Sequence, residues 1–178
     1  MTAGVLGFDE IYVWTGRLER FDWKLVGKKE MYVPYNSNMS VAGKEDNDHI
    51  FMGDKHVNPD HVRYELHRVW VVEATVKPGL RHLSPKAKYY VDEDNWIALL
   101  GDHWDAKGQF WKSGFNTPVV LPEVPTTFTM NFGFIDFTSG TQYYAAMYGN
   151  TGRNKITWKE NWPTGFFTPD SLAGEGIR

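Results

Sequence analysis

Six histidines and two groups of carboxylates are the residues of this chain that could support metal binding or acid–base chemistry. The histidines are His49, His56, His61, His67, His82 and His103. They show neither H-x-H nor H-E-x-x-H spacing, two patterns found at metal sites. Asp92, Glu93 and Asp94, followed by Asp102 and Asp105, lie in turn sequences, where Asp forms local hydrogen bonds. The sequence therefore predicts neither a metal site nor a catalytic carboxylate pair.

Arrangements for nucleophilic, nucleotide or nucleic-acid chemistry are also missing. The chain has no cysteine, and neither Ser113-Gly114 nor Ser139-Gly140 belongs to a G-x-S-x-G elbow. It contains no glycine-rich phosphate loop. The net charge is −3, with no basic stripe that would follow a nucleic acid. We expect a protein without catalytic residues, cofactor or nucleic-acid partner, and we rank a hydrolase of hydrophobic esters last among its functions.

The most regular pattern is a long segment of alternating side chains at 62–76. With period two, one face carries apolar residues and a single charge, and the other carries most of the polar residues. The first face consists of Val62, Tyr64, Leu66, Arg68, Trp70, Val72, Ala74 and Val76. A strand this long is typical of a large antiparallel sheet in which one face is covered.

Further strands are predicted through most of the chain. Alternation at 18–26, a turn at Gly27-Lys28 and a strand at 29–35 predict one hairpin, and a short strand is expected at 10–15. Turn signals such as Asp105–Gly108 separate strands at 87–91, 96–100, 109–115, 126–138 and 141–148. The fold class is therefore mainly β: a curved antiparallel sheet, an open or half-closed barrel of meander hairpins with few short helices. A β-sandwich is the alternative.

Aromatic and apolar side chains in phase along these strands form the candidate ligand-binding set. Its members are Trp14, Phe21, Trp23, Tyr64, Leu66, Arg68, Trp70, Phe128, Met130, Phe132 and Phe134. Such a surface can hold an acyl chain, because each buried methylene contributes about 0.8 kcal/mol. The other interpretation is an ordinary core. Arg68 binds a ligand carboxylate or phosphate, pairs with a cross-strand Asp or Glu, or extends its charged head into solvent at the sheet rim.

Two segments resemble a known family. RFDWKLVGKKEMYVPYN (20–36) and YELHRVWVVEATVKPG (64–79) resemble a bacterial family of unknown function that is similar to outer-membrane lipoprotein-sorting proteins, the LolA/LolB-like group. The resemblance continues through YYVDEDNWIALLGDHWD (89–105) to Phe167-Thr168-Pro169. It implies that residues 1–178 are one domain and the C-terminal part of a larger LolA/LolB-like domain. It also implies a periplasmic or outer-membrane location, although the chain as given shows no signal peptide.

Together these observations predict a non-enzymatic binding protein that holds a lipid or another hydrophobic small molecule on the concave face of the sheet. The long loop at 36–60 is a possible lid. The alternative is an interaction module that docks an envelope protein, or a second copy of itself, through an apolar face or an open sheet edge.

Overall fold

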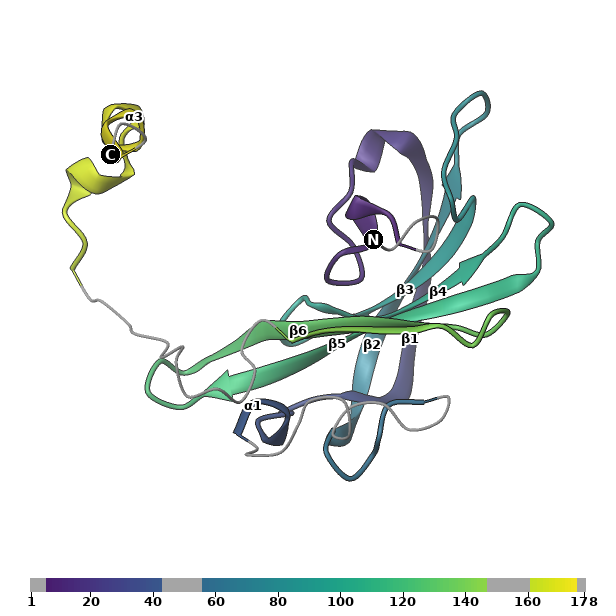
Figure 1. Cartoon of the computed structure of the whole chain (residues 1–178), viewed down its shortest axis with the longest axis horizontal. Helices are drawn as coiled ribbons and strands as arrows, with labels where there is room; N and C mark the ends of the chain where they lie inside the picture. Colours follow the sequence, from purple (N-terminus) through teal and green to yellow (C-terminus); the bar gives the residue numbers. More distant parts are fainter. Residues whose placement is uncertain (1–5, 43–55, 147–160, 176–178) are drawn as a thin grey trace.

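The computed structural model describes residues 6–42, 56–146 and 161–175. Seven strands form one antiparallel sheet in the order β1-β2-β3-β4-β5-β6-β7, so each strand pairs with its neighbour in the chain (Figure 1). The strands are β1 Phe21–Pro34, β2 Tyr64–Val76, β3 Lys86–Asp92, β4 Ala98–Trp104, β5 Phe110–Leu121, β6 Thr126–Asp136 and β7 Gln142–Ala146. The short helices are η1 Phe8–Glu10, η2 Leu18–Arg20, α1 Met39–Ala42, η3 Thr164–Phe167 and α3 Pro169–Glu175.

This architecture confirms the predicted mainly β fold with meander connections. The sheet is strongly twisted and is not closed into a barrel, because β1 and β7 stand at its two ends in the described part of the chain (Figure 1). The β4–β5 turn closes as predicted, with the N–H of Gly108 donating to the Asp105 carbonyl and Gly108 at φ +74°.

The predicted hairpin at Gly27-Lys28 is wrong. β1 runs continuously from Phe21 to Pro34, and its pairing with β2 shifts by one residue between Leu25 and Gly27. Gly27 has φ +144°, a conformation that glycine adopts easily. The glycine therefore marks a β-bulge, which bends a strand without ending it.

β2 differs from the one-sided strand that its alternation predicted. Val69 and Val71 are buried on one face of the sheet, whereas Ala74 is buried on the other. Leu66, on the same face as Ala74, is 58% exposed. The strand therefore changes its buried face midway, because different parts of the chain cover its two ends.

The segment at 6–17 covers one face of the sheet, called here the N-terminal face (Figure 1). The predicted strand at 10–15 is wrong: η1 occupies its start, and Tyr12 and Val13 follow with positive φ values of 51° and 71°. Val13 packs with Phe21, Ala74 and residues of β3 in a buried cluster. The segment thus closes the core without adding a strand.

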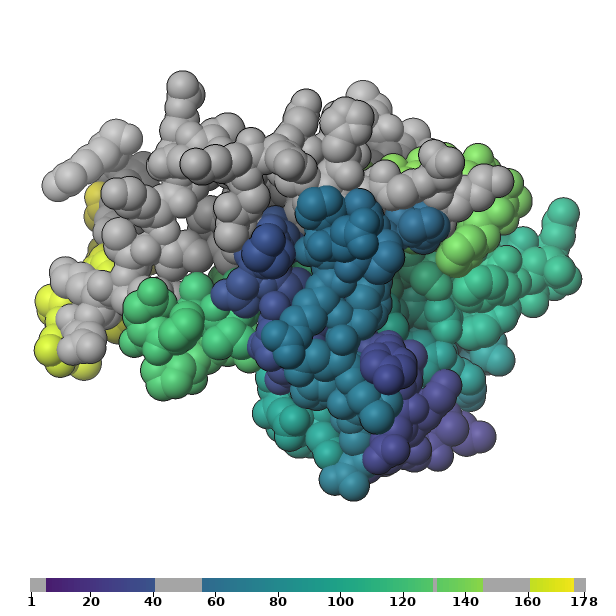
Figure 2. Space-filling model, turned by 90° about the horizontal axis from the view of Figure 1, so that it is seen from below, coloured from purple at the N-terminus to yellow at the C-terminus, as the bar shows by residue number. Residues whose placement is uncertain are grey.

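The opposite face is covered by residues 36–42 and 56–62, with Val57 and Val62 packed against Phe115 and Ile135. Figure 2, seen from below, shows these two stretches side by side on that face. The predicted loop lid at 36–60 therefore begins and ends on the face away from the N-terminal segment. Its residues 43–55 lie outside the described part of the chain.

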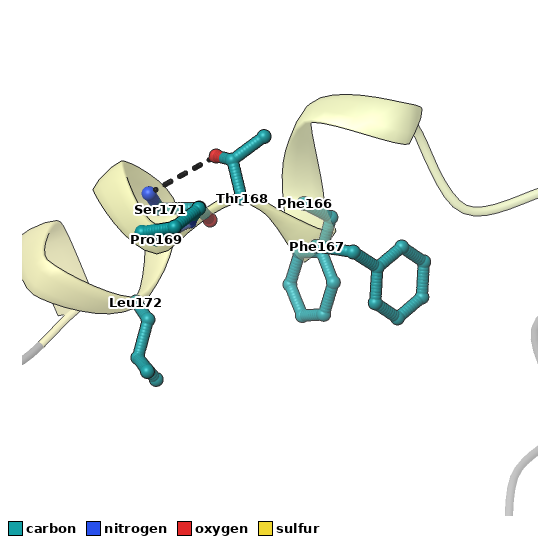
Figure 3. A pocket seen from close by; sticks show the side chains of 6 residues that line it. All are labelled: Phe166, Phe167, Thr168, Pro169, Ser171 and Leu172. Atoms are coloured by element: carbon teal, nitrogen blue, oxygen red, sulfur yellow. Dashed lines mark hydrogen bonds between the residues drawn. The ribbon is translucent and has the colours of Figure 1, made fainter.

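The C-terminal segment forms a short helix that is capped at its start. The backbone N–H of Ser171 donates to Oγ1 of Thr168, which stands just before Pro169 at the start of α3 (Figure 3). Phe166, Phe167 and Leu172 line an open apolar hollow on this segment, which lies away from the sheet in Figure 1.

Candidate functional site

Three of the predicted binding residues meet at one end of the N-terminal face. The ring of Trp14 lies 5.2 Å from the rings of both Phe21 and Trp23, measured between centroids. Tyr89 of β3 closes the group, 5.5 Å from Trp14. Phe21 is 2% exposed. In this conformation the cluster packs against the protein's own N-terminal segment.

A second group lies farther along the same face, on β6 and β7. Phe132 and Phe134 are buried, with the Tyr12 ring 4.8 Å from Phe132 and the Tyr143 ring 5.5 Å from Phe134. A cavity of about 180 Å³ remains between the N-terminal segment and the sheet. It is lined by Leu6, Gly7, Phe8, Ile11, Phe132 and Tyr143.

A third group occupies the uncovered end of the same face, on β1 and β2. Tyr64 and Leu66 are 39% and 58% exposed, and Tyr32 opposite Leu66 is 67% exposed. The Trp70 ring is half-buried, with Nζ of Lys28 4.2 Å from its centroid. This uncovered end and the cluster around Trp14 lie at opposite ends of the β1–β2 pair.

Arg68 has a protein partner. Its Nε donates to Oε1 of Glu93 at 2.6 Å, and Lys28 Nζ donates to the other oxygen of Glu93 at the same distance. These two hydrogen bonds lower the pKa of Glu93 below its ordinary value. The arrangement matches the cross-strand pairing that the sequence left open, and the pair lies at an exposed position where its contribution to stability is small.

Two predicted residues remain apart from these groups. Phe128, near the start of β6, is 44% exposed. The side chain of Met130 lies outside the described part of the structure.

Buried charges hold the N-terminal segment on the sheet. Lys112 of β5 is 1% exposed, and its Nζ donates to Oε2 of Glu10 at 2.6 Å. The Gly7 N–H and Ser84 Oγ also donate to the Glu10 carboxylate, each at 2.8 Å. Burial raises the pKa of Glu10, but His103, Lys112 and the Gly7 N–H outweigh it, and the net shift is downward.

Neutral and charged groups nearby complete this attachment. Burial lowers the pKa of His103 to about 4, and its Nδ1 lies 3.5 Å from Oε1 of Glu10. Asn116 donates to the carbonyl of Tyr12 at 2.9 Å. Beside η1, His82 Nε2 and Asp9 Oδ2 are 2.8 Å apart. The cover is therefore one irregular stretch of chain held by polar contacts at a few points.

This attachment was not predicted from the sequence. Lys112 shares its strand face with Gly114 and Asn116, a pattern that in the sequence looks like a solvent-exposed face. The partner itself, Glu10, lies 102 residues away, and nothing in its surroundings identifies it.

In the described residues, one group of side chains could hold a metal ion: His67, Asp92 and Asp94. It lies on the opposite face of the sheet from the aromatic clusters. Within the same described ranges, no helix combines the length and apolar character needed to cross a membrane.

An open antiparallel sheet with an aromatic face under a single stretch of chain defines the structural class of this protein. The chain belongs to the family "Protein of unknown function (DUF1329)", whose model matches residues 1–173. This confirms the resemblance to a bacterial family of unknown function. An uncharacterized protein of Pseudomonas aeruginosa is 36% identical over 182 residues, which cover 98% of this chain and 38% of that protein. The chain thus spans well under half the length of this relative.

Two solved structures are similar at a TM-score of 0.44. One, from Vibrio parahaemolyticus, is described as a "putative outer membrane lipoprotein-sorting protein domain"; it is 10% identical, and the match covers 90% of this chain and 51% of that one. The other is a DUF1329 family protein from Desulfovibrio piger, 13% identical, with 86% of this chain and 48% of that one covered. Similarity at this level carries no conclusion about ligands.

Proposed function

We propose that this domain is a non-enzymatic binding protein whose N-terminal face takes up a hydrophobic ligand, such as the acyl chain of a lipid, when the segment at 6–17 moves aside. The observation that carries the proposal is the contrast between face and cover. The face carries two groups of aromatic side chains on paired strands, together with the buried polar side chains of His103, Lys112 and Asn116. The cover has no strand pairing with the sheet.

The size of the remaining cavity requires movement of the cover. At about 180 Å³, the space between the segment and β6–β7 is smaller than the roughly 300–1,000 Å³ of a usual ligand pocket. An acyl chain entering there contacts Phe132 and Tyr143 first. Displacing Tyr12 and Val13 then extends the site toward Phe21 and Trp23. There the acyl chain takes over the contacts that the segment made with these two rings.

The energetics favour such an exchange. Each buried methylene of a ligand contributes about 0.8 kcal/mol, so a long acyl chain can replace the apolar contacts of Val13 and Trp14. The polar contacts of Glu10 oppose the opening and set its cost. We place this activity in the periplasm or at the outer membrane, as the sequence resemblance implies.

Ligand occupancy measured by native mass spectrometry tests the proposal. The wild-type protein and the variant Tyr143→Glu are each mixed with palmitate or a phospholipid. Tyr143 is chosen because it lies on the short strand β7 and lines the cavity. We expect the variant to lose most of the bound ligand. Tyr32→Glu, at the uncovered end of the same face, is the matched control and should bind as wild type does. Equal binding by all three proteins would contradict the proposal.

A second function, an interaction module, is favoured by the uncovered end itself. Leu25, Tyr32 and Leu66 are each more than half exposed, and they lie on one face beside the edge of β1 that pairs with no strand of the described residues. An extended segment of another protein can pair with such an edge and cover these side chains. Concentration-dependent light scattering separates self-association through this edge from docking of a different protein.

A further inference from the structure

A compact group of potential metal ligands lies where β2 meets the β3–β4 turn. Nδ1 of His67 is 3.0 Å from Oδ1 of Asp92 and 3.8 Å from Oδ2 of Asp94. All three ligand atoms lie within 4.8 Å of one another. Ligand atoms around a four-coordinate zinc ion are about 3.4 Å apart, given zinc–ligand distances near 2.1 Å. The three atoms therefore need only small adjustments to share one ion.

The other ring nitrogen of His67 is held as it is at metal sites. Nε2 faces Oε2 of Glu65 at 3.5 Å. Glu65 is fixed in turn by Nδ2 of Asn36 at 2.8 Å and by Nε of Arg63 at 2.9 Å. A histidine that binds a metal through one nitrogen commonly donates the other N–H to a carboxylate, which orients the ring and strengthens the ligand.

The ring of His67 is also locked by packing. Tyr35 stacks on it at a centroid distance of 3.9 Å and an interplanar angle of 25°. Asp92 is 0% exposed, and the N–H of Asn95 donates to its Oδ2 at 3.1 Å, which leaves Oδ1 directed at His67. Two of the three ligands are thus held in place before any ion arrives.

Access and room for further ligands come from the neighbouring hollow. An open cavity of about 510 Å³ is lined by Tyr35, Asp94 and Asn95 together with residues of the β5–β6 turn. Asp94 has a side chain that is 70% exposed, so it stands at the mouth of the site. Water molecules entering from this side can complete a coordination shell.

We propose that His67, Asp92 and Asp94 bind one divalent transition-metal ion, with Glu65 as the positioning residue behind the histidine. One imidazole nitrogen and two carboxylate oxygens suit Zn²⁺ or Mn²⁺ better than Mg²⁺, which prefers oxygen ligands alone. The site lies on the opposite face from the aromatic surface, so it is independent of hydrophobic-ligand binding. The sequence predicted no metal site, because the three residues follow no motif.

Isothermal titration of the tag-free, chelator-treated protein with zinc chloride tests this proposal. We expect one zinc ion per chain, bound with the same affinity in the presence of millimolar Mg²⁺. Asp94→Asn alters an exposed side chain, so the fold is expected to survive, and the variant should weaken binding at least tenfold. Glu65→Gln should weaken it by about 10- to 100-fold, the range for carboxylates behind a ligating histidine. Asp22→Asn, an exposed carboxylate on β1, is the matched control and should bind as wild type does.

Two results would overturn the metal site. One is the absence of a stoichiometric zinc isotherm for the folded wild-type protein. The other is an isotherm that neither Asp94→Asn nor Glu65→Gln changes, because the ion would then be bound by other histidines at the surface.

Discussion

The two ends of the N-terminal face have similar chemistry but opposite surroundings. At one end Phe21, Trp23 and Tyr89 are packed under Val13 and the rest of the N-terminal segment. At the other end Tyr32, Tyr64 and Leu66 line the same face of β1 and β2 without cover from the described residues. An aromatic position in a strand therefore does not determine burial: the path of the segment that covers it does.

The difference also separates two kinds of binding. The covered end is available only if its own segment leaves, which suits a small hydrophobic ligand that can replace Val13 and Trp14. The uncovered end needs no rearrangement, which suits a partner that arrives as an extended strand. Substitutions made at one end at a time therefore distinguish ligand uptake at the covered end from partner docking at the uncovered end.

The largest expected effect is on the covered end. Phe21→Ala removes a ring that is 2% exposed and packs on Trp14, and we expect a loss of about 3–5 kcal/mol in the free energy of unfolding. Tyr32→Ala, at the uncovered end, should change it by less than about 0.5 kcal/mol. Chemical denaturation measures both. Similar losses for the two variants would show that the ends are equally packed.

A comparable effect is expected where the segment is attached. Lys112→Met leaves the buried carboxylate of Glu10 without its cation, and such unpaired buried charges cost about 3–5 kcal/mol. Glu10→Gln combined with Lys112→Met should recover part of this loss, because no buried charge remains. Urea denaturation of the single and double variants provides the measurement, and a double variant less stable than Lys112→Met alone would contradict the assignment.

Acid should loosen the same attachment by a smaller amount. His103 faces Glu10, Lys112, His82 and Tyr89, and the charge of Asp102 acts on it from the next position of β4. Its pKa is about 4 when folded, against 6.5 as its ordinary value. The unfolded chain thus binds a proton that the folded chain does not as the pH falls from 6.5 toward 4. The free energy of unfolding should drop by roughly 3 kcal/mol over that range. Below it, protonation of Glu10, whose pKa is lowered, adds a further loss.

Stability curves at pH 7, 5.5 and 4.5 check this dependence. His103→Gln should flatten the slope above pH 4.5, because the group that titrates differently in the two states is gone. An unchanged slope in that variant would assign the acid sensitivity to other groups.

Local signals in the sequence predicted most of the sheet. Asp105–Gly108 fixes a hairpin through its own turn conformation, and Thr168 caps α3 through a contact three residues away. The bulge at Gly27 was mistaken for a turn. Whether β1 ends or continues at this glycine depends on β2, which is long enough to pair with β1 on both sides of it. Alternation placed Phe21 and Trp23 on one face correctly, since that relation is local.

The sites depend on contacts that no local pattern contains. The segment at 6–17 has no periodicity, and Glu10 meets Lys112 across 102 residues. His67 likewise meets Asp92 across 25 residues, through the pairing of β2 with β3. Such contacts are determined by the assembled sheet, and a single sequence does not record them.

The most direct test of the binding proposal is to lock the cover in place. The chain has no cysteine, and a Cβ added at Gly101 would lie 2.9 Å from Cγ1 of Val13, so Val13→Cys with Gly101→Cys is within reach of a disulfide. Palmitate uptake is then compared between the oxidised and reduced forms of this one variant. We predict that the oxidised protein takes up no ligand and that reduction restores uptake. Equal uptake by the two forms would contradict a site beneath the N-terminal segment.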